Sequence, residues 1–147
     1  MSHLRQLSQT ALGQYTNHYL EAAKTSGQVV TSGAWTKLTY DTPSFNDCFT
    51  VASSVFTCTV AGWYAISSAA YEAGNSGIAQ LYVSKNGSSV NVTNGGEYRT
   101  SLSSLCRIIK IVYLSVGDTV EIMGYFGTTA NPLVSTSNVA ALRMVRL

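Results

Sequence analysis

Few side chains in this sequence are suited to acid–base, nucleophilic or metal chemistry. Its two histidines, His3 and His18, both lie near the start, so the rest of the chain lacks the commonest general base. The seven acidic residues show no local pairing of the kind that glycoside-type acid–base chemistry requires. No phosphate-binding glycine loop or metal-ligand spacing is present. We therefore expect no catalytic residue, metal site or cofactor, and a protein that is not an enzyme.

The cysteines Cys48, Cys58 and Cys106 form an odd set without metal-type spacing. Cys48 and Cys58 are close enough in sequence to bridge neighbouring strands as a disulfide. The favoured alternative is three reduced thiols that behave as small hydrophobic residues, as is usual inside cells.

Composition narrows the class of protein. A chain of 147 residues is long enough for one domain with a substantial core. Only 11% of the residues are charged, against about 25% in an average soluble protein. A surface so poor in charge is often partly covered by other subunits. The net charge of +2 is small and the basic residues are scattered, which argues against a nucleic-acid partner. No apolar run approaches the roughly 20 residues of a membrane span, and the start lacks a signal-peptide core, so we expect no membrane partner and an intracellular origin.

The periodicity of apolar residues divides the chain near Ser26-Gly27. Before this point they recur every three or four positions, which predicts an amphipathic helix. We assign residues 1–27 to an N-terminal arm, partly helical and docked on a partner. Two alternatives are open for it, packing on its own domain or gripping another protein. The partner-binding stripe would be Leu4, Leu7, Ala11, Tyr15, Tyr19 and Ala22.

From residue 28 to 147 the period changes to two, which is typical of strands with one buried face. In "IAQLYVSKNG", Ala79, Leu81 and Val83 share a face, and in "TVEIMGYFG", Val120, Ile122 and Phe126 do. The run "RIIKIVYLSVGD" is apolar on nearly both sides, so a strand there is expected to be covered on both faces. Turn signals such as Asn86-Gly87 separate the runs. About ten short strands without helices between them predict an all-β antiparallel sandwich or jelly roll over residues 28–147.

Three motifs carry a resemblance to a known family. They are "FTCTVAGWY" (Phe56, Cys58, Val60, Gly62, Tyr64), "LYVSKNG" (Leu81, Lys85, Asn86, Gly87) and "LSVGDTV" (Leu114, Gly117, Asp118, Val120). Their order and spacing resemble the globular head of complement subcomponent q, which shares a ten-stranded jelly roll with the tumour necrosis factor ligands. In this pattern Gly62 would permit a tight corner of the chain, and the Tyr64 ring would cover that corner. Asn86-Gly87 would form a hairpin turn that needs positive φ, and Gly117-Asp118 the next turn.

The resemblance implies a homotrimer packed along a three-fold axis through apolar and aromatic side chains. We expect the interface to include Tyr64, Tyr113, Met123 and Tyr125, with the intramolecular core as the alternative for each. Some relatives bind calcium, but no acidic cluster matches here; Asp41 and Asp47 are equally suited to be solvated loop residues. The collagen-like stalk of the family is absent, which argues against an immune role.

A short, charge-poor jelly roll with a partner-seeking arm predicts a structural virion protein. We expect a trimeric capsid decoration or cement protein of a bacteriophage, assembled in the host cytoplasm and located on the capsid surface. Its arm would bind the major capsid protein and stabilise the shell. The alternative is the receptor-binding knob of a phage fibre or another trimeric adhesin head, whose loops would bind a host surface glycan or receptor.

Overall fold

The computed structural model describes residues 18–28, 30–31, 33–73, 77–90, 98–99, 103–126 and 142–147. All regular secondary structure within these ranges is β-strand. In chain order they are β1 (Tyr19–Ala22), β2 (Trp35–Lys37), β3 (Phe45–Asn46), β4 (Phe49–Ala52), β5 (Val55–Cys58), β6 (Gly62–Ala73), β7 (Gly77–Lys85), β8 (Ser88–Ser89), β9 (Tyr98–Arg99), β10 (Ser103–Leu114), β11 (Thr119–Phe126) and β12 (Leu142–Arg146).

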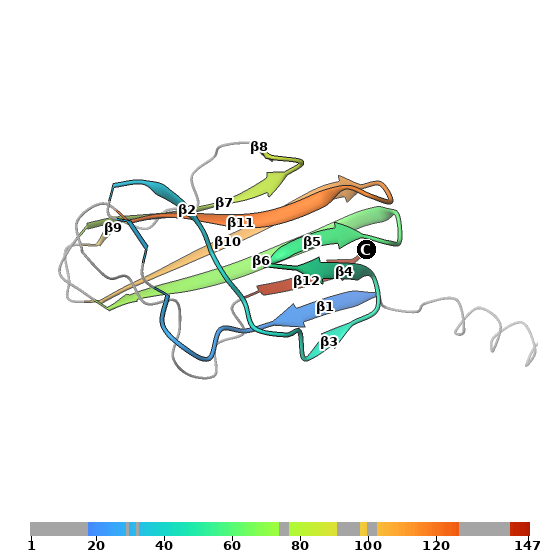
Figure 1. Ribbon diagram of the computed structural model, residues 1–147. Coiled ribbons are helices and arrows are strands. Elements are labelled where there is room, and N and C mark those ends of the chain that lie inside the picture. Colours follow the sequence, from blue (N-terminus) through green and yellow to red (C-terminus); the bar gives the residue numbers. More distant parts are fainter. Residues whose placement is uncertain are drawn as a thin grey trace, which may run out of the picture.

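The strands form two antiparallel sheets that pack face to face (Figure 1). The first sheet has the order β10-β6-β12-β1-β3. The second has the order β4-β5-β11-β7-β8, with β2 also paired to β11 and β9 to β7. Neighbours in each sheet are mostly distant in sequence, as in a jelly roll, and the expected all-β jelly-roll class is confirmed. The described ranges contain twelve strands, against an expected number of about ten, and three of the twelve have only two residues.

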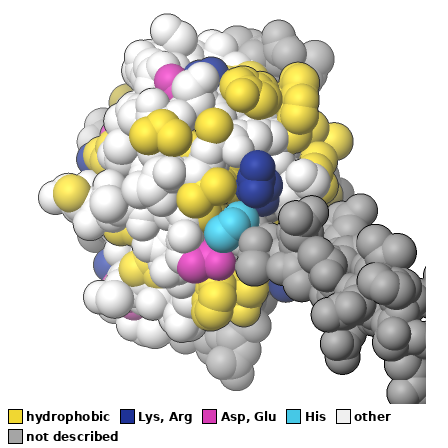
Figure 2. All heavy atoms as spheres, turned by 90° about the vertical axis from the view of Figure 1, so that its right-hand side faces the viewer, with side chains coloured by type: hydrophobic (Ala, Val, Ile, Leu, Met, Phe, Trp, Pro, Cys, Tyr) yellow, Lys and Arg dark blue, Asp and Glu magenta, His cyan; other side chains and the backbone are white. Residues whose placement is uncertain are grey.

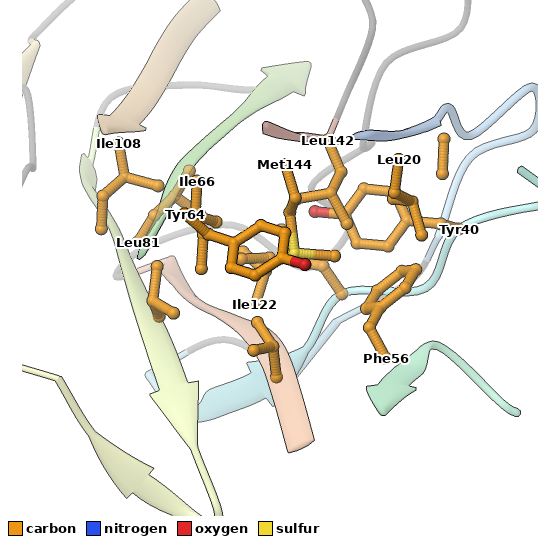
Figure 3. Packing of buried hydrophobic residues seen from close by; sticks show 14 of the residues in the cluster. Leu20, Tyr40, Phe56, Tyr64, Ile66, Leu81, Ile108, Ile122, Leu142 and Met144 are labelled. Carbon is orange, nitrogen blue, oxygen red and sulfur yellow. The ribbon is translucent and has the colours of Figure 1, made fainter. Parts of the chain in front are cut away.

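One hydrophobic core fills the space between the sheets (Figure 3). Each long strand contributes alternate residues to it because successive side chains of a strand point to opposite faces. Strand β11 shows this alternation along its whole length, with every second residue buried. The largest fully buried side chains are Tyr64, Phe56, Phe126, Leu20, Leu38, Ile66, Leu81, Leu114, Ile122, Leu142 and Met144.

Residues Tyr19–Ala22, which were expected to be helical, form strand β1. Residues Tyr19–Ala22 pair with β12 on one side and β3 on the other, so they belong to the sandwich and not to a helical arm. Leu20 and Ala22 are buried in the core, and Tyr19 faces the opposite way. The remaining stripe residues, Leu4, Leu7, Ala11 and Tyr15, lie outside the described residues.

Two of the expected turns have the predicted backbone conformation. Asn86 and Gly87 both have positive φ, at 51° and 77°, as the hairpin between β7 and β8 requires. Gly117 has a φ of 89° in the turn before β11. Gly62 is different, because it is the first residue of β6 and has no positive φ; a Cβ there would lie 2.6 Å from Nε of the Arg146 side chain, which packs over it. Its smallness serves close packing rather than a corner.

A side chain closes part of the free edge of β4. Asn46 Nδ2 donates a hydrogen bond to Phe49 O at 2.5 Å, and Phe49 N donates to Asn46 Oδ1 at 3.0 Å. The amide therefore satisfies the same two backbone groups that a neighbouring strand would satisfy.

Candidate interaction surface

The outer face of the first sheet is built from side chains in cross-strand rows. The pairing register aligns Tyr113 with Trp63, and in the next row Ile111 with Ala65. Further along, it aligns Ile109 with Ser67. Strands β12 and β1 extend these rows across the sheet with Val145, Tyr19, Arg143 and Glu21. The register thus places apolar side chains together toward the end of β10 and polar ones toward its start.

Large apolar side chains on this face are open to solvent. Ile109 is 73% exposed, Ile111 62%, Trp63 55% and Tyr113 46%. We call these four residues, together with Ala65, Val145, Tyr19 and Phe45, the apolar face. Contiguous exposed apolar surface of this kind marks an interaction site in a soluble protein.

The aromatic side chains of the apolar face are ordered by contacts with one another. Trp63 and Tyr113 meet edge to face, with ring centroids 5.5 Å apart. Tyr19 and Phe45 stack, with centroids 3.9 Å apart, and the guanidinium of Arg143 lies 5.9 Å from the Tyr19 ring. Because the rings already hold one another, little side-chain entropy remains to be lost when a partner covers them.

Strand β10 gives the apolar face an open border. It is twelve residues long and stands at the edge of the first sheet, where β6 is its neighbour. Val112 and Ile108 point into the core, while Ile109 and Ile111 point outward. The strand is thus apolar on both sides, but the expected cover on both faces is seen only on the core side, because no described residue covers Ile109 and Ile111.

The position of Tyr64 differs from the expected one at a subunit interface. It is fully buried, packs edge to face on Phe49, and its hydroxyl donates to Val60 O at 2.6 Å. Figure 3 shows its ring inside the core. Burial raises the pKa of this hydroxyl above its usual range. The side chain has no surface to offer a second subunit, so the intramolecular alternative holds.

The other three expected interface residues are not brought together. Tyr113 belongs to the apolar face. Met123 and Tyr125 lie on β11 in the second sheet, on the side facing away from the core. They and Tyr113 therefore occupy opposite outer faces of the sandwich. Trp63, Ile109 and Ile111 were missed, although the two-sided apolar pattern of β10 pointed toward them.

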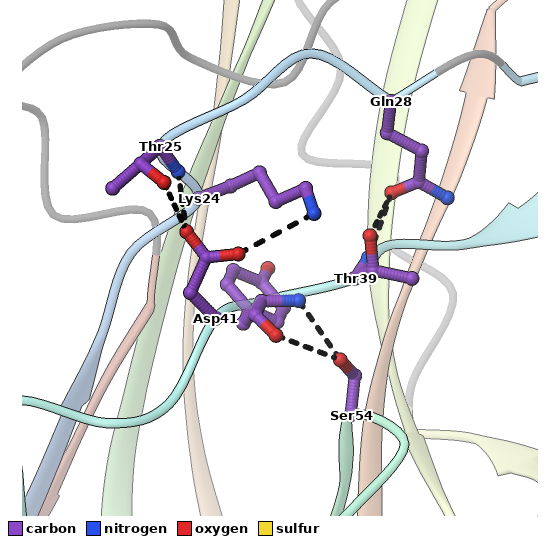
Figure 4. Close-up of polar contacts among 7 residues, drawn as sticks. Lys24, Thr25, Gln28, Thr39, Asp41 and Ser54 are labelled. Carbon is purple, nitrogen blue, oxygen red and sulfur yellow. Dashed lines mark hydrogen bonds and ion pairs between the residues drawn. The ribbon is translucent and has the colours of Figure 1, made fainter.

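The acidic side chains near the start of the sandwich bind the polypeptide itself. Asp41 accepts hydrogen bonds from the Thr25 hydroxyl and backbone N–H at 2.5 and 2.7 Å, and forms an ion pair with Lys24 (Figure 4). The contacts with Thr25 lower the pKa of Asp41. Asp47 accepts from Tyr19 N at 3.0 Å and lies 3.2 Å from His18 Nδ1. Both carboxylates are therefore engaged in fastening the first strand and the segment after it.

The three cysteines are free thiols, and all are buried. Desolvation by burial raises the pKa of Cys48 to about 12 and also raises that of Cys58. A thiol with a raised pKa is a poor nucleophile, which agrees with the favoured reading of Cys48, Cys58 and Cys106 as small hydrophobic residues.

The first and last described residues, His18 and Leu147, lie at the same end of the sandwich. Arg146 N donates to His18 O at 2.8 Å, and Leu147 N donates to Trp63 O at 2.8 Å. Figure 2 looks onto this end, with the histidine beside an acidic side chain and exposed hydrophobic side chains around them. His18, the first described residue, therefore lies next to the apolar face.

Comparison with known proteins identifies the fold. No family model and no curated protein sequence matches the chain. Among solved structures, murine APRIL at pH 5.0 matches with a TM-score of 0.71 and 15% identity, over 90% of this chain and 100% of that one. The Eiger tumour necrosis factor of S. frugiperda matches with a TM-score of 0.64 and 11% identity, over 89% and 91% of the two chains.

The globular domain of the zebrafish complement 1qA protein is also similar. Its TM-score is 0.57 with 18% identity, over 87% of this chain and 92% of that one. The resemblance seen in the sequence motifs is thereby confirmed in three dimensions. This chain has the jelly-roll fold shared by the tumour necrosis factor ligands and the globular heads of complement subcomponent q.

Proposed function

We propose that the chain is a non-enzymatic head that assembles as a homotrimer through its apolar face. The observation that carries the proposal is the exposure of Ile109, Ile111, Trp63 and Tyr113 on one face of the first sheet. Covering these side chains removes apolar surface from water, which favours association. The open edge of β10 lets a neighbouring copy approach this face from the side.

The polar end of the same face favours a specific register between copies. Arg143 and Glu21 stand opposite each other in the β12–β1 pairing, and Arg107 is exposed on β10. Charged groups at the border of an apolar patch fix orientation more than they add affinity. A closed ring of three subunits uses one such contact, repeated by symmetry.

The expected assembly state is tested by native mass spectrometry. We expect a species three times the 15.7 kDa mass of one chain. Ile111→Asp should shift the protein to monomer because it places a charge on the apolar face, whereas Thr50→Asp, at an exposed position of β4 in the second sheet, should leave the trimer intact. A monomeric wild type, or an Ile111→Asp protein that stays trimeric, would refute assembly through this face.

We further propose that the trimer is a capsid decoration protein of a bacteriophage, with residues 1–17 binding the major capsid protein. In support, the chain enters the sandwich at the end where Arg146 and Leu147 lie, so three copies of the segment would leave one end of the trimer together. Linked segments gain avidity because the second and third bind at high effective concentration. The low charge of the chain suits a surface largely shared with other subunits.

The receptor-binding knob is the second candidate, and a feature of the topology favours it. Strands β6 and β11 end, and strands β7 and β10 begin, at the opposite end of the sandwich from His18. A head anchored at the His18 end would direct these strand ends outward. Both candidates assume the same trimer, so the assembly state does not separate them.

Copy number separates the two candidates. Quantitative mass spectrometry of the purified particle would count this chain against the major shell protein. Hundreds of copies, a multiple of three for each three-fold site, would establish decoration of the shell. A few tens of copies or fewer would reject it in favour of the knob.

A further inference from the structure

A second exposed surface lies on the outer face of the second sheet, on the other side of the sandwich from the apolar face. Three aromatic side chains from three different strands meet there: Trp35 of β2, Tyr82 of β7 and Tyr125 of β11. The Trp35 ring is 4.6 Å from that of Tyr82 and 5.4 Å from that of Tyr125, measured between centroids. We call these three residues the aromatic platform.

The platform is built by strand pairing rather than by a loop. Tyr125 stands opposite Trp35 in the β11–β2 ladder, and Tyr82 stands opposite Met123 in the β11–β7 ladder. Strand backbones therefore fix the relative positions of the rings. A rigid scaffold of this kind presents a surface already shaped for a ligand.

The polar atoms of the platform are unoccupied. The indole N–H of Trp35 and the hydroxyls of Tyr82 and Tyr125 have no hydrogen-bond partner among the described residues. Trp35 is 39% exposed and both tyrosines are half-buried. Tyrosine and tryptophan usually find partners for these groups, and combine an apolar ring with a polar tip where one side is wet. The platform therefore offers ring faces and hydrogen-bonding groups to the same ligand.

The surroundings indicate a ligand without net charge. Lys37 and Glu121 border the platform, and their charges compensate each other in an ion pair with Nζ and Oε1 3.4 Å apart. Gln80 stands opposite Tyr125 and adds an uncharged amide. A phosphate, sulfate or acidic peptide would find no unpaired cation among these neighbours, whereas hydroxyl groups would find both donors and acceptors.

From this geometry we infer that the aromatic platform binds a neutral glycan, a chain of hexose or N-acetylhexosamine units. A pyranose ring has C–H groups on its face, which lie against an aromatic ring, and hydroxyls at its edge. The hydroxyls would bond to Tyr82, Tyr125 and Gln80 while the sugar face covers Trp35. The site differs from the loops considered above as receptor contacts, and does not depend on what residues 1–17 bind.

Assembly through the apolar face leaves the platform open, because the two surfaces lie on opposite sides of the sandwich. A trimer would then carry three platforms. Single sugar sites are weak, and three linked sites raise the apparent affinity for a multivalent glycan by avidity.

The test is binding of the labelled protein, residues 1–147, to a glycan array. The array would carry neutral hexose- and N-acetylhexosamine-terminated saccharides beside sialylated and sulfated ones. We expect signals on neutral saccharides, reduced at least tenfold by Trp35→Ala and several-fold by Tyr82→Phe, which removes only the hydroxyl. Thr50→Ala, at an exposed position of β4 in the same sheet, is the matched control and should bind as the wild type does.

Three outcomes would overturn the inference. The first is that no neutral saccharide gives an array signal above background. The second is that the protein binds only the charged saccharides. The third is that Trp35→Ala does not reduce binding to neutral saccharides. Circular dichroism of each variant checks that it is folded, and Trp35→Phe, which keeps a ring, should retain part of the signal if ring stacking is the cause.

A second experiment separates failure of glycan binding from failure of trimer assembly. Saturation-transfer NMR with a free saccharide from the array measures the platform one site at a time, in the wild type and in Ile111→Asp. Saturation transfer that is equal in the wild type and Ile111→Asp and lost in Trp35→Ala supports glycan binding by the platform in either assembly state. If a saccharide that binds on the array shows no saturation transfer with the wild type, glycan binding by the platform is rejected.

Discussion

At the scale of single residues, adjacent side chains on one strand have opposite roles. Trp63 and Tyr64 are neighbours on β6, yet Trp63 lies on the apolar face and Tyr64 is fully buried. The aromatic pair alone does not say which ring faces inward, since a shift by one residue would exchange them. The pairing of β6 with β10 decides it, and that register is a property of two segments about forty residues apart along the chain.

Tyr64→Phe tests the buried role of this hydroxyl. Removing it leaves Val60 O with the weak Cys58 Sγ donor at 3.1 Å, so we expect the free energy of unfolding to fall by about 0.5–1.5 kcal/mol. Urea unfolding at fixed protein concentration measures this. The control is Tyr125→Phe, whose hydroxyl has no partner in the described chain and should be neutral. A change in native mass for Tyr64→Phe would instead return Tyr64 to the interface.

Asp118 predicts an acid-dependent loss of stability. Its carboxylate accepts from Asn86 Nδ2 at 2.8 Å, forms an ion pair with Lys85 at 2.9 Å and accepts from Ser115 N at 2.8 Å, which lowers its pKa to about 2. Because the folded pKa is below the unfolded value of about 3.9, the stabilisation is complete above pH 4 and is lost as the pH falls toward 2.

Melting temperatures measured from pH 7 to pH 2 would reveal this contribution. Asp118→Asn should melt lower than the wild type at pH 7, and the difference should shrink between pH 4 and pH 2. A difference that stays constant across this range would mean that the Asp118 contacts do not stabilise the folded state through the charge.

At the scale of elements, alternation in the sequence predicted the long strands well. The buried faces expected for β7 and β11 are those observed, with Ala79, Leu81 and Val83 in one and Val120 and Ile122 in the other. The turn at Asn86-Gly87 was also predicted, because a positive φ at two successive residues favours this dipeptide strongly. These features depend on residues close together in the chain.

Strand β1 was predicted wrongly for the opposite reason. Apolar residues spaced by three, such as Tyr19 and Ala22, match a helix when nothing else is known. In the fold, Tyr19–Ala22 fills the gap between β12 and β3, and the β12 pairing links residues more than a hundred positions apart. Tertiary pairing overrides a four-residue local pattern. The aromatic platform was invisible for the same reason, since its three rings come from distant strands.

Gly124 is an element-scale feature that alternation does not explain. It occupies an inward position of β11, where a Cβ would lie 2.7 Å from Phe126 Cε2 and 3.0 Å from Leu38 Cδ2. We expect Gly124→Ala to lower the free energy of unfolding by about 1–3 kcal/mol through overpacking. Adding Leu38→Val should recover part of that loss if the clash is the cause. Chemical denaturation of the two single variants and the double variant gives the coupling, and strict additivity would exclude a clash with Leu38.

At the scale of the whole molecule, strand β1 shows that the sandwich already includes the chain from Tyr19 onward. Deleting residues 1–17 removes none of the described strands, so we expect a folded trimer that no longer sediments with capsids. Deleting residues 1–26 also removes β1 and the buried Leu20, a loss of about 1.5–3 kcal/mol for that side chain alone, besides the ladder bonds to β12 and β3.

The two deletions are therefore distinguishable by circular dichroism, native mass and co-sedimentation. The shorter deletion should keep the β-sheet spectrum and the trimer mass, and the longer one should lose both or fail to accumulate as soluble protein. Capsid binding that survives the shorter deletion would refute the role proposed for residues 1–17.

The Asn46 amide has a consequence for the behaviour of the protein at high local concentration. An uncovered strand edge is a template for pairing with other chains and so for aggregation, and β4 lies at the end of the second sheet. By occupying the N–H and C=O of Phe49, the Asn46 side chain denies those groups to a foreign strand. Hydrolysis of this amide to a carboxylate would remove the donor to Phe49 O and expose it. The shelf life of concentrated preparations would then depend on the slow chemistry of one asparagine.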